Sequence, residues 1–143
     1  MNEQFEAFAE SCAVQCTAEP LGLAPRDPTA TLEQAELHYL VTLTRPGSGA
    51  PVRFIFVKPA TDAEPPTAAE VLWWMAGDAH MMEGAQADVG LWATGFGLPA
   101  RADGTARLFD QQRQQCAALR KLLGDVGYRR LIAIYESEMV GSP

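Results

Sequence analysis

Two segments with apolar side chains at alternate positions, joined by a glycine-rich turn, constrain the fold more than any other feature of the sequence. Residues 37–44 place a leucine, a tyrosine, a valine and a second leucine at every other position, which is the period of a strand with one buried face. Residues 52–57 are rich in β-branched and aromatic side chains, and the Pro-Gly-Ser-Gly sequence at 46–49 favours a turn. The sequence therefore predicts an antiparallel β-hairpin.

A short helix is predicted before the hairpin. Phe5, Phe8, Ala9 and Cys12 are spaced so that they lie on one helical face, the pattern of a helix that packs against a core. Between this helix and the hairpin, residues 13–19 are able to form a further strand. Because three strands are more stable than an isolated hairpin, we expect an antiparallel sheet of two or three strands.

The part of the chain after the hairpin is predicted to be helical. Residues 58–66, which include three prolines, form a linker. Thr67 followed by Glu70 is a capping box, and it predicts a helix from Thr67 to about Gln86. Glycines follow the next two helical segments and end them. The further helices are predicted over residues 88–94, from Asp103 or Thr105 to about Leu123, and over about 126–135.

These elements predict a single α+β domain over residues 1–143, with a helix and the sheet in 1–57, the linker in 58–66 and the helical part in 67–137. A chain of 143 residues with 48% apolar side chains is long and apolar enough for one core. Three to four helices after the sheet would pack on one of its faces, because an apolar sheet face must be covered. The long helix is expected to bury Leu108, Ala118, Leu119, Leu122 and Leu123.

Charge is unevenly distributed along the chain. The net charge is −7, and residues 1–100 hold 13 acidic and 4 basic side chains, so this part would repel phosphate and attract a basic surface. Direct binding of DNA or RNA is therefore not expected. The alternative is that the acidity serves solubility alone.

The sequence also bears on the compartment. No apolar run approaches the ~18–20 residues that cross a bilayer, and the first residues lack the basic character of a secretory signal. Three cysteines cannot all pair with one another, and an odd number in a domain of this size indicates a reducing compartment. We therefore expect a cytoplasmic protein that does not engage a membrane.

Metal binding has little support. Cys12 and Cys16, together with His38 and His80, are the candidate zinc ligands, but a second closely spaced pair of ligands is missing. Buried cysteines that serve as small apolar side chains are the more common outcome. We expect neither a metal nor another cofactor.

Catalysis has little support either. His80 and Glu83 are three residues apart on a predicted helix and are able to pair as a general base. Such a pair is far more often a solvated contact on a helix surface. No nucleophile elbow of the Gly-x-Ser-x-Gly type is present. We therefore predict that the protein is not an enzyme.

Adjacent tryptophans, Trp73 and Trp74, lie in the predicted helix that begins at Thr67. Neighbouring side chains on a helix point about 100° apart, so one indole is able to enter the core while the other stays near the surface. An exposed tryptophan is typical of a binding surface. The more common outcome is that both are buried where the helix meets the sheet.

Residues 37–124 carry one further pattern. After the strand at 37–44 come a Pro-Thr-Ala-x-x-Val-Leu helix start at 66–72, Asp78 near the helix centre, Trp92, a Gly-Phe-Gly break at 95–97, and a Gln- and Arg-rich helix that ends Leu-Leu-Gly at 122–124. In this order of features the chain resembles small accessory proteins encoded by tailed phages and prophages. Proteins of this type include inhibitors of bacterial defence systems, among them anti-CRISPR proteins.

The resemblance implies a phage-derived inhibitor in the cytoplasm of a bacterial host, which binds a protein or ribonucleoprotein complex, in particular a CRISPR effector. It would block nucleic-acid engagement by steric and electrostatic competition. We expect Trp73 or Trp74 to be an apolar anchor beside six acidic binding residues. The acidic residues are Asp62, Glu64, Glu70, Asp78, Glu83 and Asp88. The alternative is a phage structural or assembly protein that self-associates, as a homodimer for instance, through the tryptophan-bearing helix.

Overall fold

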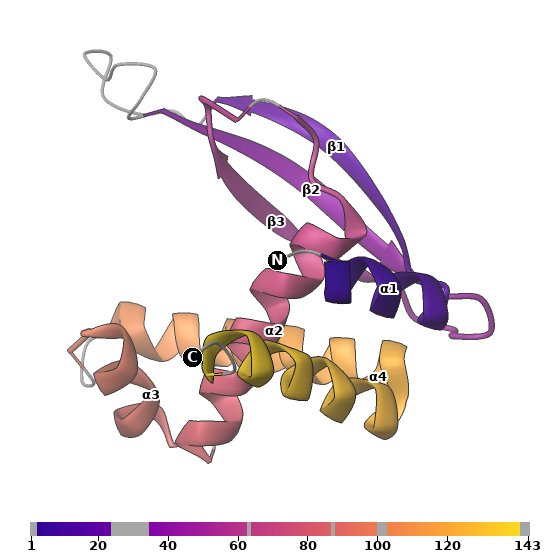
Figure 1. Cartoon of the computed structure of the whole chain (residues 1–143). Coiled ribbons are helices and arrows are strands. Elements are labelled where there is room, and N and C mark those ends of the chain that lie inside the picture. The colour runs from indigo at the N-terminus through magenta and orange to yellow at the C-terminus, as the bar shows by residue number, and fades with distance from the viewer. Residues whose placement is uncertain (1–2, 24–34, 63, 87, 100–102, 141–143) are drawn as a thin grey trace.

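A computed structural model describes residues 3–23, 35–62, 64–86, 88–99 and 103–140 and confirms the predicted α+β class. The three strands form one antiparallel sheet in the order β1-β2-β3, and the helices lie on one side of it (Figure 1). The elements are α1 (Glu3–Cys12), β1 (Gln15–Leu23), β2 (Glu36–Thr44), β3 (Val52–Pro59), α2 (Ala68–Ala85), α3 (Val89–Phe96) and α4 (Asp103–Val140). None of the helices in the described ranges combines the length and the hydrophobicity needed to span a lipid bilayer.

The predicted hairpin is present with the predicted faces. Tyr39, Val41 and Leu43 of β2 are buried, and they pair across the ladder with Phe56, Phe54 and Val52 of β3. The third strand is also present, since β1 pairs with β2 along its length. It runs beyond the predicted residues 13–19, and its register shifts at a bulge between Pro20 and Gly22.

Arg45, just after β2, connects three parts of the fold. Its Nε donates to the carbonyl oxygen of Cys12 at the end of α1, at 2.9 Å. Its Nη1 donates to the carbonyl oxygens of Leu123, at 2.9 Å, and Leu122, at 3.3 Å. The carbonyl groups at a helix end have no partner within the helix, and a cation there satisfies them and interacts favourably with the helix dipole. Arg45 thereby fixes both helix ends against the sheet.

Lys58 makes a second cationic contact, at the other end of the sheet. The prediction placed it in a linker, but β3 extends to Pro59, and the Lys58 side chain is only 5% exposed. Its ammonium donates to Asp62 Oδ2 at 3.0 Å, to Glu70 Oε1 at 3.1 Å and to the carbonyl oxygen of Glu64 at 2.8 Å. Burial lowers the pKa of Lys58, but the hydrogen bonds and charges of Asp62 and Glu70 outweigh this effect and leave the pKa raised. The ammonium therefore holds the connection from β3 to α2 in place.

The predicted helix boundaries are largely confirmed. Thr67 caps α2, since its Oγ1 accepts a hydrogen bond from the amide of Glu70 at 3.2 Å. Gly97 caps the end of α3 in the left-handed conformation. Gly124, with φ 76° and ψ 164°, interrupts α4, and the segment after it runs back alongside the first (Figure 1). This last segment continues to Val140, beyond its predicted end.

Leu108 was predicted to lie on the buried apolar face of α4, and this prediction is wrong. Leu108 is 51% exposed, and the neighbouring Phe109 is buried instead. Phe109 packs edge-on against Trp92 of α3, with ring centroids 5.5 Å apart, so the larger aromatic side chain sets the rotation of the helix. Leu119, Leu122 and Leu123 are buried as predicted.

Replacing Lys58 with methionine should lower the free energy of unfolding by about 2 kcal/mol or more, since it leaves the carboxylate of Glu70 and the carbonyl of Glu64 without their partner. Urea denaturation at neutral pH measures the change. Lys121→Met, at an exposed position on α4, is the matched control and should change stability by less than about 0.5 kcal/mol. Equal stability of the two variants would contradict a structural role for Lys58.

Candidate functional site

A groove opens between α2, α3 and the second segment of α4, with a volume of about 290 Å³. We call it the tryptophan groove. It is lined by Trp73, Trp74, Gly77, Asp78 and Met81 of α2, by Gly95 and Phe96 of α3, and by Tyr135 and Met139 of α4. Three of the residues named from the sequence, the two tryptophans and Asp78, therefore meet in one place.

The two tryptophans have different environments. Trp74 is 58% exposed, whereas Trp73 is half-buried and packs against the core. Their rings lie 5.7 Å apart at an angle of 46°. Trp73 is therefore only half-buried and Trp74 stays at the surface, so the more common outcome, burial of both indoles, is wrong.

Tyr135 forms the opposite wall because α4 turns back at Gly124. The ring fits closely against α2, since a Cβ atom on Gly77 would lie 3.3 Å from it. His80 lies above the same ring, with centroids 5.5 Å apart, and its Nδ1 contacts Glu136 Oε2 at 3.1 Å. The carboxylate that contacts His80 therefore comes from the returning helix and not from Glu83, the candidate partner on its own helix.

Asp78 is the one carboxylate in the lining of the tryptophan groove. Its side chain is partly buried, and within the described ranges it makes no hydrogen bond or ion pair. Burial raises the pKa of Asp78 to about 6. Deeper in the core, burial and then the charge of Asp78 raise the pKa of the Cys116 thiol to about 12. At neutral pH the groove therefore holds a carboxylate that is charged but incompletely solvated.

The other acidic residues named from the sequence lie outside the groove. Asp62 and Glu70 bind Lys58, and Asp88 caps α3 by accepting from the amides of Gly90 and Leu91. The side chains of two more are exposed, Glu64 beside the Lys58 contact and Glu83 at a hollow that Arg120, Tyr128 and Arg129 also line. The six carboxylates thus do not form one surface, and three of them stabilise the fold.

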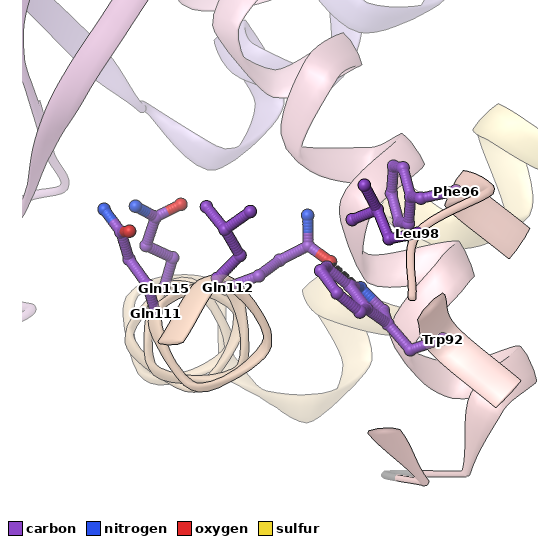
Figure 2. Close-up of a pocket in the computed structure, with 7 residues that line it drawn as sticks. Trp92, Phe96, Leu98, Gln111, Gln112 and Gln115 are labelled. Atoms are coloured by element: carbon purple, nitrogen blue, oxygen red, sulfur yellow. Dashed lines mark hydrogen bonds between the residues drawn. The ribbon is translucent and has the colours of Figure 1, made fainter. Parts of the chain in front are cut away.

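A neighbouring pocket of about 300 Å³ lies between α3 and α4 and shares Phe96 with the tryptophan groove. Figure 2 shows Gln112 reaching across it to Trp92, whose indole N–H donates to the Gln112 Oε1 atom. Phe96 and Leu98 lie together on the α3 side. The central polar contact of this pocket joins two residues of the chain, whereas Asp78 in the tryptophan groove has no such partner among the described residues.

The cysteines and histidines do not gather into a metal centre. In the part of the chain that the structure describes, no three His, Cys, Asp or Glu side chains are arranged to hold a metal ion. Cys12, Cys16 and Cys116 are free thiols, and burial is the main reason why the pKa of Cys16 is raised as well. A thiol with a raised pKa is a poor nucleophile at neutral pH.

Comparison with known proteins gives no relative from which to transfer a role. No protein-family model, no curated protein and no solved structure matches this chain. The tryptophan groove, built from side chains of three helices, is therefore the feature on which a functional proposal rests.

Replacing Asp78 with asparagine should make the protein more stable at pH 7.5, by up to about 3 kcal/mol, because burial raises the pKa of the native carboxyl well above its ordinary value, to about 6. A carboxyl with a raised pKa destabilises the fold once it is ionised. The gain should therefore be near zero at about pH 4 and grow as the pH rises through 6.

Urea unfolding at several pH values tests this expectation. Asp110→Asn is the control, because Asp110 is exposed on α4 and pairs only with Arg113 of the described residues. A variant at position 78 that is less stable than the native protein at pH 7.5 would show that the carboxylate has a structural partner.

Proposed function

We propose that this protein acts by binding another protein through the tryptophan groove, and that it is a phage-derived inhibitor of a bacterial defence complex. The observation that carries the proposal is Trp74, an indole that is 58% exposed at the mouth of an open, aromatic-lined groove. Large exposed aromatic side chains are costly in water and are enriched among the residues that dominate binding energy.

The size and lining of the groove favour a side chain as its occupant. A volume of about 290 Å³ lies at the lower limit for pockets that enclose small ligands, and it suits one inserted side chain. Met81 and Met139 border the groove, and the flexible thioether of methionine adapts to partners of different shape. Phe96 and Met139 are themselves exposed and would extend the contact around the inserted group.

The class of partner comes from the resemblance of residues 37–124 to phage accessory proteins. A net charge of −7 supports it, since an acidic protein is attracted to the basic surface of a nucleic-acid-handling complex. Glu64 and Glu83 have exposed side chains and are free to act at long range. In this proposal the protein works in the cytoplasm of the bacterial host and competes with nucleic acid for a CRISPR effector.

Self-association through α2 is the second candidate function. The exposed Trp74, Phe96 and Met139 that favour a foreign partner would serve a second copy of the chain equally well. The two functions differ in one measurable property, because only self-association makes the mass in solution depend on protein concentration.

Replacing Trp74 with alanine should weaken partner binding about 30-fold or more, the effect of losing about 2 kcal/mol at a hot spot. The partner is first captured from lysates of a host with active CRISPR and restriction systems, and its affinity for native and variant protein is then measured. Leu91→Ala is the matched control, since Leu91 on α3 is also 58% exposed but does not line the groove.

An unchanged affinity of the Trp74 variant would contradict the proposed binding site. Recovery of the protein alone, with a concentration-dependent mass that the variant loses without unfolding, would support self-association instead.

Reversing the charge of Glu64 and Glu83 to lysine should slow association with the captured partner and reduce its dependence on salt, because long-range attraction governs the association rate. Asp88 is left unchanged, since it caps α3 and its loss would disturb the fold. Rates are measured by surface plasmon resonance at several salt concentrations. An unchanged rate and salt slope would rule out the electrostatic part of the mechanism.

A further inference from the structure

We infer that the tryptophan groove receives an arginine side chain of the partner, with Asp78 as its counter-ion and the surrounding rings as its stacking surfaces. The inference rests on the proposed function for the source of that side chain. It adds the chemical identity of the group that enters the groove, and it makes Asp78 a specificity-determining residue.

The first argument is that the charge of Asp78 has no partner among the described residues. Its titratable neighbours do not supply a cation. On α2, His80 is engaged with Glu136 and Glu83 is itself acidic. From α4, Cys116 and Tyr128 are neutral at physiological pH, because burial is the main cause that raises the pKa of each.

The nearby arginine on α4 is also engaged elsewhere. Arg120 Nε donates to Asp125 Oδ1 at 2.7 Å, and the guanidinium lies over the Tyr128 ring. The remaining wall, α3, carries no titratable side chain between Val89 and Phe96. In the described structure a partly buried carboxylate therefore faces a solvent-open groove without a counter-ion, and a partner's cation would supply one.

The second argument is the aromatic lining. Trp73, Trp74 and Tyr135 line the same groove as Asp78, the two tryptophans from α2 and the tyrosine from α4. A cation over an indole or phenol ring is attracted by its π electrons, and the attraction is larger where water is partly excluded. The same contact occurs twice among the described residues, with Arg120 over Tyr128 and Arg130 over Phe8, each 5.5 Å from the ring centroid.

The third argument selects arginine over lysine. A guanidinium is planar, binds a carboxylate through two parallel N–H groups and stacks on aromatic rings, whereas an ammonium is a compact and strongly hydrated charge. The groove offers both a carboxylate and flat ring faces within about 290 Å³. Its rim of Met81, Phe96 and Met139 would pack along the aliphatic stem of the inserted side chain.

Binding of the cation should be linked to the ionisation of Asp78. The pKa of the free carboxyl is about 6, and a bound guanidinium favours the ionised form. Affinity should therefore be constant above about pH 7 and fall about tenfold by pH 5, where most Asp78 in the free protein carries a proton.

The test uses two small probes of nearly the same shape, the cationic N-acetyl-arginine amide and its neutral isostere N-acetyl-citrulline amide. Binding to the full chain is followed through the indole N–H signals of Trp73 and Trp74 in NMR spectra at pH 7.5 and pH 5. We expect the arginine probe to bind with a Kd of about 1–10 mM at pH 7.5, and the citrulline probe to bind at least about fivefold more weakly.

Two variants show whether Asp78 causes the preference for arginine and the pH dependence of binding. Asp78→Asn, which should fold at least as well as the native protein, should lose both the preference for arginine and the pH dependence. Asp110→Asn should keep both, since its exposed carboxylate lies outside the groove. Equal affinity of the native protein for the two probes, or no shift of either indole up to about 50 mM arginine probe, would overturn the inference.

The outcomes separate this inference from the proposed function. Capture of a host partner that depends on Trp74 but is indifferent to Asp78→Asn leaves the protein-binding proposal intact and overturns the arginine inference. Arginine-selective binding by the groove that Asp78→Asn abolishes, without any captured partner, supports the inference and counts against the proposed inhibitor.

Discussion

The buried ammonium of Lys58 determines where α2 leaves the sheet, and the candidate site depends on that direction. It joins the end of β3 to the first turn of α2 through Glu70, and it binds the intervening chain through Asp62 and Glu64. Since α2 provides most of the lining of the tryptophan groove, the placement of the groove follows from this contact. Arg45 helps to place the opposite wall, which α4 provides, because it donates to the carbonyl groups of Leu122 and Leu123 just before the turn of α4.

Carboxylates occur in two kinds of environment in the described structure, bound by other groups of the chain or partly buried without such a partner. Asp62 and Glu70 are bound by Lys58, and Asp88 is bound by backbone amides at the start of α3. Asp78 is half-buried, whereas Asp62 and Asp88 are exposed, yet within the described residues it makes no hydrogen bond or ion pair. Burial accordingly raises its pKa to about 6. A group that destabilises the free protein is more readily explained by a bound partner than by the fold itself.

Features set by neighbours in sequence were predictable, and features set by distant contacts were not. The hairpin and the cap at Thr67 follow from local spacing, and both are confirmed. Lys58 was misassigned to a linker because its partners are recognisable only once α2 has packed. The groove was found in part, through Trp74 and Asp78, but nothing in the sequence places Tyr135 opposite them. The expected kinship with phage inhibitors stays a prediction.

The backbone conformation of Gly124 bears on how mutation could change the width of the tryptophan groove. Its φ of 76° and ψ of 164° lie in a region that is essentially restricted to glycine, so the angle between the two segments of α4 is set at a single residue. Tyr135 and Met139 lie on the segment beyond that residue. A substitution at position 124 would therefore change the width of the groove while every side chain that lines it stays the same.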